Sequence, residues 1–282
     1  MKQKMLTFII LLIFSAHSWP DISTDGTVGS ALNLSGPEFQ ITQNLGSHVG
    51  NNLFHSFAQF NILDQQTAIF SGDSSIQNVI SRVTGGQASN IEGTLRSKVE
   101  QADFYFINPA GIIFGDNAQI DVPAAFYAST AAKLNFTDGA SFNAINPESS
   151  QLTMASPDSF GFTNDQTGQI TITSQGLEFK PATRVNFNSQ NINIVNAEII
   201  AEGIQLQLVA NGSQNQEITI ETLPNHSLQG DFTMLQSRIN ISGNGTEQLQ
   251  ITAGNTALLD SELSANTIGN INHNETHAIE IR

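Results

Sequence analysis

The chain has 282 residues and a formal net charge of −15, although only 12% of its residues are charged, so uncharged polar side chains must cover much of its surface. Nucleic acids and anionic membranes are bound mainly through Lys and Arg. The chain has 10 of these residues, so we expect no nucleic-acid partner. The absence of cysteine excludes disulfides, thiolate metal sites and a cysteine nucleophile.

The first eighteen residues have the pattern of a secretory signal peptide. Two lysines precede an apolar run from Met5 to Phe14, which is too short to anchor a protein across a bilayer. Ala16 and Ser18 then place small residues at the −3 and −1 positions of a cleavage site before Trp19. We expect residues 1–18 to be removed and the remaining chain to be exported.

Short β-type runs separated by Gly, Pro and Asn open the mature chain. Phe39–Thr42 alternates strictly between apolar and polar residues, and Asn52–Ile62 is rich in large apolar side chains. The second run could form a helical stripe, but its β-rich surroundings favour a strand with a bend. His55 lies within this run, and we expect a hydrogen-bonded structural histidine rather than a titrating site.

The segment Ser74–Val83 carries the strongest helical signal outside the signal peptide. Its apolar residues follow a helical spacing of i, i+3, i+4 and i+7. They are also mostly β-branched, which suits a strand equally well. Helix and strand both remain open here, and Gly85 and Gly86 end the segment in either case.

Residues 108–111 predict a tight turn between two apolar runs. Asn108 is suited to position i of a type I β-turn, Pro109 to position i+1 and Gly111 to position i+3. The run that follows, Ile112–Phe114, is apolar at consecutive positions, which predicts a strand covered on both faces.

Further short runs follow at residues 118–122, 125–129 and 133–136. Residues 141–161 are poorly patterned and contain two prolines and many small polar residues. They lack the length and the compositional bias of a linker. We expect them to leave the regular core as an excursion.

From residue 168 the chain repeats a short alternating pattern of polar residues with Ile or Leu. The apolar pairs begin at 170, 192, 218 and 239, which gives spacings of 22, 26 and 21 residues. A period in the twenties with alternating strands indicates a solenoid of stacked coils, and favours a parallel β-helix over a sandwich. Ile and Leu should point inward, and Asn, Thr and Gln outward.

No constellation of residues indicates catalysis or a metal site. Glu198 with Glu202, and Glu217 with Glu221, are four residues apart, which is about 13 Å along a strand. Pairs formed across coils remain open, so a secreted carbohydrate-active enzyme on the same fold is the alternative, with an adhesive module as a third candidate. We expect no enzyme activity, no cofactor and no metal ion.

Four segments resemble one known family. Asn108-Pro109-Ala110-Gly111-Ile112 is similar to the Asn-Pro-Asn-Gly-Ile motif in the secretion domain of filamentous-haemagglutinin-like exoproteins, the passengers of two-partner secretion. Ala110 stands where that motif has Asn. The other three segments are Ile22–Gly29, Gly50–Phe57 and Ser75–Gly86. A separate Asn-Pro-Asn-Leu motif of the family is absent, and Asn51-Asn52-Leu53 comes nearest to it.

The resemblance implies a right-handed parallel β-helix with extra strands capping its amino-terminal end. Residues 19–282 would form the secretion domain, with residues 19–165 carrying the motifs and residues 166–282 forming regular coils. The implied recognition and folding residues are Asn108, Pro109, Gly111, Ile112, Asn52, Leu53, Phe54, His55, Ser56 and Phe57.

The implied partner is an outer-membrane β-barrel transporter whose periplasmic domains recognise the largely unfolded chain. The protein would then fold at the surface of a Gram-negative-type cell, where it stays attached or is released, with its first coils templating the later ones. A host or neighbouring cell surface is the expected target of such an adhesin. Ala278–Arg282 begins another alternating strand, so we expect the sequence to end within a solenoid.

Overall fold

The computed structural model describes residues 21–282, apart from residues 166, 180–181, 221, 223, 225–226, 243–247 and 265–278. The expected signal peptide and the histidines at 226, 273 and 277 lie outside the described residues. In the described part of the chain, no helix reaches the length and hydropathy that a membrane span needs.

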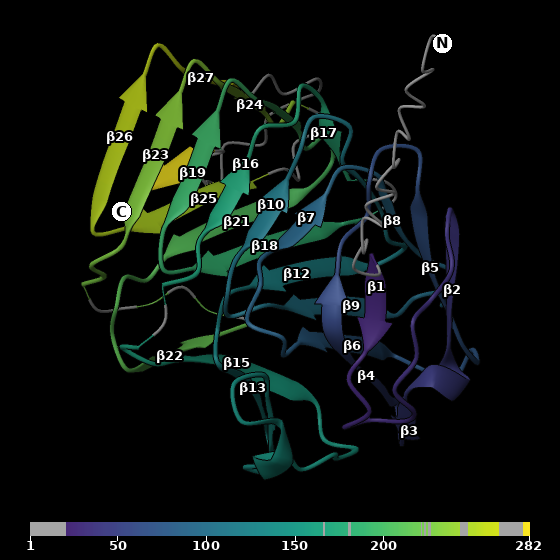
Figure 1. Cartoon of the computed structure of the whole chain (residues 1–282). Helices are drawn as coiled ribbons and strands as arrows, with labels where there is room; N and C mark the ends of the chain where they lie inside the picture. The colour runs from purple at the N-terminus through teal and green to yellow at the C-terminus, as the bar shows by residue number, and fades with distance from the viewer. Residues whose placement is uncertain are drawn as a thin grey trace, which may run out of the picture.

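The chain winds as a solenoid with three sides, and strands of successive coils lie side by side in parallel (Figure 1). The first side is sheet A, in which β4 and every later strand run parallel. Its members are β1 (Ile22–Thr24), β3 (Ser47–Val49), β4 (Asn52–Phe60), β6 (Asn78–Val83), β9 (Asp103–Ile107), β12 (Ala125–Ser129), β18 (Arg184–Ser189), β21 (Gln205–Ala210), β25 (Gln248–Ala253) and β28 (Ile279–Ile281).

The second side is sheet C, also parallel, which receives the chain after each turn from sheet A. It contains β7 (Ser89–Ile91), β10 (Ile112–Phe114), β16 (Ile170–Ile172), β19 (Ile192–Val195), β23 (Asp231–Leu235) and β26 (Asn255–Leu259).

The third side consists of two parallel sheets that continue one another through a bridge between Ile120 and Phe179. Sheet B holds β2 (Glu38–Thr42), β5 (Thr67–Ser71), β8 (Thr94–Ser97) and β11 (Gln119–Asp121), and sheet E holds β17 (Leu177–Glu178), β20 (Glu198–Ile200), β24 (Arg238–Asn240) and β27 (Glu262–Ser264). This arrangement is the parallel β-helix that the sequence predicts.

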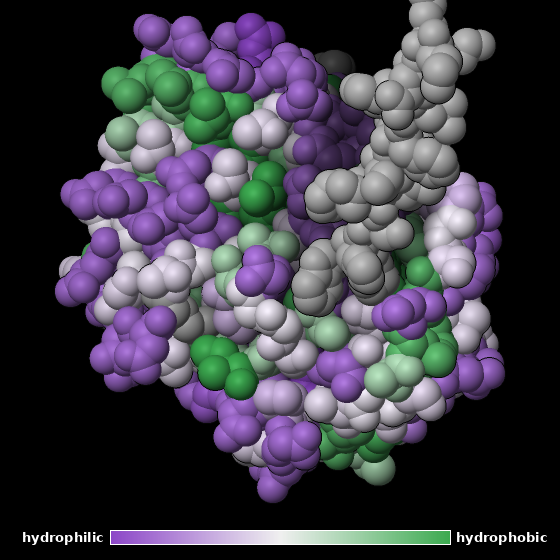
Figure 2. All heavy atoms as spheres, viewed as in Figure 1, coloured by the Kyte–Doolittle hydropathy of each residue, from purple (hydrophilic) through white to green (hydrophobic). Residues whose placement is uncertain are grey.

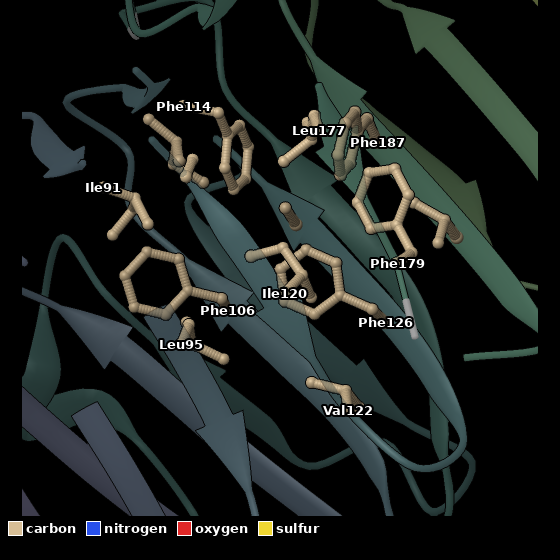
Figure 3. Close-up of a cluster of buried hydrophobic side chains, with 14 of the residues drawn as sticks. Ile91, Leu95, Phe106, Phe114, Ile120, Val122, Phe126, Leu177, Phe179 and Phe187 are labelled. Atoms are coloured by element: carbon tan, nitrogen blue, oxygen red, sulfur yellow. The ribbon is translucent and has the colours of Figure 1, made fainter. Parts of the chain in front are cut away.

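Side chains from all three sides fill the interior of the solenoid (Figure 3). Because parallel strands are in register, like residues stack from coil to coil. Phe104 on β9 lies beside Phe126 on β12, and Phe126 lies beside Val185 on β18. The rings of Phe114 and Phe187 stack with their centroids 5.3 Å apart. The face seen in Figure 2 is largely hydrophilic, with separate apolar patches.

Antiparallel strands close the amino-terminal end of the solenoid, as the family resemblance implies. Strand β1 pairs with β4 from one side, and β3 folds back on the start of β4. A short 3-10 helix, η1 (Gln43–Leu45), leads into β3. These two strands cover the amino-terminal edge of β4 in sheet A, which protects that edge from pairing with other chains.

The expected excursion at residues 141–161 is part of a separate antiparallel sheet, sheet D, which packs on the outer face of sheet A. A second apolar core lies between them and includes Phe54, Ile80 and Phe142. Sheet D contains β13 (Lys133–Phe136), β14 (Ser141–Asn143), β15 (Pro157–Phe162) and β22 (Gln216–Thr219), and the 3-10 helix η2 (Pro147–Ser149) follows β14.

The assignment of the repeat to one series of coils is wrong in part. Ile218 belongs to β22, which runs antiparallel to β15 in sheet D, and Ile239 lies in sheet E rather than sheet C. On sheet C the stacked positions are Ile170, Ile192 and Phe232. Any strand with one buried face shows the same alternation of apolar and polar residues, so this pattern alone does not show which sheet the strand joins.

Two further strand predictions are resolved. The segment with both helical and strand signals forms β6, and the run from Asn52 forms the strand β4.

The prediction that Ile112–Phe114 is covered on both faces is wrong, because Ile113 is 37% exposed between two buried neighbours. Its outward neighbours on the adjacent strands, Asn90 and Thr171, are polar.

Candidate functional site

Residues 108–111 form the turn that the sequence predicts, at the corner between sheet A and sheet C. The backbone N–H of Gly111 donates to the carbonyl of Asn108 at 3.0 Å. The Asn108 side chain is fully buried and bonds in two directions. Its Oδ1 accepts from the Ala110 N–H at 3.0 Å, and its Nδ2 donates to the Gln87 carbonyl and the Ser89 Oγ, each at 2.9 Å.

This turn is enclosed by the coils before and after it. The Ser89 N–H donates to the Gly111 carbonyl, and the Ile112 N–H donates to the Gln169 carbonyl, both at 3.0 Å. A Cβ at Gly168 would lie 2.1 Å from the Pro109 carbonyl oxygen, so only glycine allows this approach. Gly111 itself has a φ of 125°, a conformation that side chains disfavour.

Later coils open at the same corner. The chain leaves sheet A after β12 to build β13, β14 and β15 before it returns as β16, and it leaves again after β21 to build β22. The Asn108 turn is therefore a tight form of a corner that holds insertions after β12 and after β21, whereas the corner between β18 and β19 is tight as well.

The second motif, residues 52–57, lies on β4 and points to both faces of sheet A. Leu53, His55 and Phe57 face the interior of the solenoid, whereas Asn52, Phe54 and Ser56 face sheet D. All six residues are buried.

The outward-facing residues of this motif attach sheet D to the first coil. The Asn52 Nδ2 donates to the carbonyls of Thr153 and Ala155, at 2.9 and 2.7 Å. The Phe54 ring meets the rings of Phe136 and Phe142 edge-on. Residues about 100 positions apart in the chain are thus joined at the start of β4.

His55 is buried, as expected for a structural histidine, but the expectation that it is hydrogen-bonded is wrong. Neither ring nitrogen has a hydrogen-bond partner among the described residues. The imidazole packs against Phe57 and Phe70 in the apolar interior. Burial lowers the pKa of His55 to about 3, so the ring is neutral at physiological pH.

Between β4 and β9 lies β6, and it carries a residue that the sequence analysis did not single out. Arg82 is 1% exposed and faces sheet D. Its Nε donates to the Ser56 Oγ at 2.8 Å, its Nη2 to the Thr27 Oγ1 at 2.8 Å, and its Nη1 to the Asn143 carbonyl at 2.6 Å. Nη1 also donates to the Ser150 Oγ at 2.5 Å.

The Arg82 guanidinium further lies over the Phe142 ring, with Cζ 3.9 Å from the ring centroid. Burial lowers the pKa of Arg82 to about 10, while the charges of Asp25 and Glu148 oppose the shift. Arg82 therefore stays charged at neutral pH. Its position in the family-like segment Ser75–Gly86 is the one sequence signal that could have drawn attention to it.

Asp25, which is half-buried, completes this polar network. Its Oδ2 accepts from the Ser56 Oγ at 2.6 Å and from the Thr84 Oγ1 at 2.7 Å, and its Oδ1 accepts from Thr27. Burial raises the pKa of Asp25, but the hydrogen bonds from Ser56, Thr27 and Thr84 outweigh burial and hold it below its usual value. Three of the four family-like segments thus meet at Asp25, Ser56 and Arg82.

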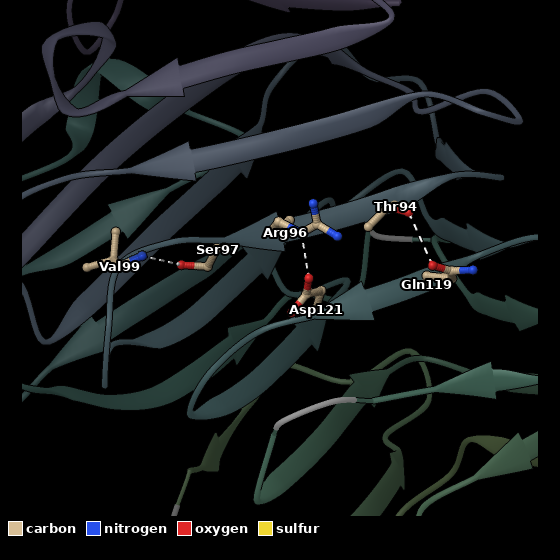
Figure 4. A network of polar contacts seen from close by, with 6 residues as sticks. All are labelled: Thr94, Arg96, Ser97, Val99, Gln119 and Asp121. Carbon is tan, nitrogen blue, oxygen red and sulfur yellow. Dashed lines mark hydrogen bonds and ion pairs between the residues drawn. The ribbon is translucent and has the colours of Figure 1, made fainter.

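The polar pairs on the outer faces of the solenoid are different in kind. On β8 and β11, Arg96 and Asp121 form an ion pair at 2.5 Å with side chains about 40% exposed (Figure 4). Exposed pairs of this type contribute little stability. On sheet E, Arg238 forms an ion pair with Glu262 at 2.8 Å. Arg238 occupies the position between Glu198 and Glu262 on neighbouring strands, so these two carboxylates are not adjacent. No cluster of potential metal ligands occurs among the described residues.

A parallel solenoid whose motif side chains are mostly buried within its coils defines a β-helical structural module. The comparison with known families agrees: the family model described as the TPS secretion domain matches residues 20–274. The chain belongs to this family of two-partner secretion domains, which is a secretion family and not an enzyme family. It is accordingly the secretion domain of an exoprotein exported across a Gram-negative envelope. No protein with a curated description matches the chain.

Proposed function

We propose that the periplasmic domains of a cognate outer-membrane transporter bind this chain while it is unfolded, and that its first coils then template the folding of the rest at the cell surface. The burial of most residues of the two motifs carries the proposal. Asn52, Leu53, Phe54, His55, Ser56, Phe57, Asn108 and Ile112 are all 0% exposed. A receptor can read these side chains only before the coils close.

The coil architecture supports the templating step. Each strand of sheet A from β6 to β28 pairs in parallel with a strand of the coil before it. Each added coil buries apolar side chains on the previous one, so folding can proceed without an external energy source. Residues 19–282 would act as one unit, in which residues 19–165 start the solenoid and residues 166–282 extend it.

Secretion with and without the transporter tests the proposal. Residues 1–282 are expressed in a Gram-negative host with the cognate transporter or with a transporter lacking its periplasmic domains. We expect the mature chain in the medium or at the cell surface only with the intact transporter, and in the periplasm otherwise. Equal amounts outside both strains would refute transporter recognition.

For the exported protein we further propose adhesion to a host or neighbouring cell surface. The outer positions of the coils carry uncharged polar side chains such as Asn193 and Thr233, which can form hydrogen bonds without a strong charge preference. Binding of the purified mature chain to intact cells tests this role. Binding no greater than that of an unrelated β-helix of similar charge would contradict it.

A further inference from the structure

Arg82 connects parts of the chain that are far apart in sequence. Its hydrogen-bond partners lie 55 and 26 residues before it, at Thr27 and Ser56, and 61 and 68 residues after it, at Asn143 and Ser150. The early partners belong to the amino-terminal cap and the first coil. The late partners belong to β14 and the residue that follows η2, which are parts of sheet D and its connections.

The late segment supplies part of what the guanidinium contacts, because Nε and Nη2 donate to the early residues Ser56 and Thr27. Both acceptors of Nη1 come from residues 143–150, and so does the charge of Glu148, while Phe142 provides the ring beneath the group. Arg82 remains protonated, so it cannot be buried as a neutral group. Before the late segment covers it, the guanidinium faces water on the outer side of sheet A. The covering segment must bring acceptors for Nη1 when it docks, because a buried charge whose partners are missing is strongly unfavourable.

The apolar surroundings of Arg82 depend on the same late segment. Phe54 and Ile80, the outward-facing residues of β4 and β6, belong to the core between sheets A and D. The Phe54 ring lies 5.1 Å from that of Phe142, centroid to centroid. Before residues 136–150 dock, the outer face of the first coils has an uncovered apolar surface next to a cation whose Nη1 is hydrated instead of bound to Asn143 and Ser150.

We propose that Arg82 is a folding checkpoint: β1, β4 and β6 become stably packed only when the segment from β14 to Ser150 docks on them. The first coils would then stay open, and their motifs accessible, until about seventy further residues have passed the transporter. The biological meaning rests on the proposed secretion function. The physical claim concerns folding alone, and it is tested without a transporter.

The test is hydrogen exchange with pulse labelling during refolding of the full mature chain, residues 19–282. We expect the amides of β4 and β6 to become protected in the same kinetic phase as those of β14 and β15. In Arg82→Met, which removes the charge but keeps an apolar side chain, β4 and β6 should become protected at least about threefold earlier than β14 and β15. Arg96→Met, at the exposed ion pair, should leave the wild-type order unchanged.

Protection of β4 and β6 ahead of β14 and β15 in the wild-type chain would overturn the proposal. A simultaneous phase in both the wild type and Arg82→Met would also overturn it, since the coupling would then be apolar and independent of the charge. If Arg82→Met does not refold, Arg82→Gln tests the same loss of charge with hydrogen-bonding capacity retained. A chain that passes this test and still leaves the cell without its transporter would refute the secretion function alone.

Discussion

Asp25 and Arg82 are connected through two hydroxyl groups. Ser56 donates to Asp25 at 2.6 Å and accepts from Arg82 at 2.8 Å, and Thr27 donates to the same carboxylate and accepts from the same guanidinium, both at 2.8 Å. The opposite charges thus share hydroxyls that are oriented by both. This arrangement holds the amino-terminal cap, the first coil and β6 together.

Ser56→Ala should destabilise the protein by about 1–3 kcal/mol. The variant lacks the hydroxyl, so the buried Arg82 Nε loses its acceptor and Asp25 Oδ2 loses one of its donors. Chemical denaturation of the purified mature chain measures the free energy of unfolding. Thr94→Val is the control, because its hydroxyl makes an exposed contact of 3.4 Å with Gln119. Equal losses in the two variants would show that the Asp25–Arg82 network adds no stability.

Asn108→Ala should lower stability by about 2 kcal/mol or more, since it removes one acceptor and two donor contacts at a buried corner. Secretion should fall as well. The matched control is Asn193→Ala, whose amide makes an exposed bond to Gln169. If the unfolded Asn108→Ala chain binds the transporter's periplasmic domains as the wild type does, Asn108 acts in folding and not in recognition.

Gly168→Ala should disrupt the corner around Pro109. The new Cβ would lie 2.1 Å from a carbonyl oxygen, and backbone must move to relieve the overlap. We expect a loss of about 1–3 kcal/mol, seen as a lower midpoint of thermal unfolding. Gly176→Ala is the control, because open space surrounds its Cβ position. A midpoint unchanged in Gly168→Ala would contradict the close approach of the two coils.

The buried, neutral His55 should make the free energy of unfolding fall as the pH is lowered. Its pKa falls from 6.5 to about 3 on folding, so the unfolded chain binds more protons between these values. Stability from the neutral ring is complete above pH 6.5 and decreases as the pH falls towards 3, by about 2 kcal/mol between pH 6.5 and pH 5. Denaturation at a series of pH values measures the effect.

The control for this pH dependence is a pair of variants. His55→Leu should remove most of the change above pH 5, whereas His48→Asn, at an exposed position on β3, should leave it intact. Asp25 acts in a lower range, because its pKa is depressed on folding and its contribution is lost only as the pH falls below about 4. A pH profile unchanged by His55→Leu would refute the assignment.

The sequence predicts the class of fold and the local strands well, because these follow from alternation and turn chemistry. Ile192 and Ile194 face the interior as their spacing requires, and Asn108–Gly111 forms the expected turn. The place of Ile218 could not be predicted. The alternating pattern around Ile218 is compatible with a strand of sheet D and with a solenoid coil. Its pairing with β15 places it in sheet D.

The polar network around Arg82 could not be predicted from the sequence, for a related reason. Arg82 occupies a position on β6 whose side chain faces away from the solenoid core, which in a strand usually means solvent. The segment that covers it lies 61–68 residues later in the chain. His55 shows the opposite case: a polar residue at an interior position was expected to have a partner, yet its neighbours are Phe57 and Phe70.

The central claim is that the transporter reads the unfolded chain, and a time-resolved binding measurement tests it most directly. The mature chain is diluted from urea into buffer containing the labelled periplasmic domains, and binding is followed while the chain refolds. We predict that binding is present at once and disappears at the rate of refolding, with none to the native chain, because residues 52–57, Asn108 and Ile112 are buried. Native protein that binds as tightly as the freshly diluted chain would contradict the account.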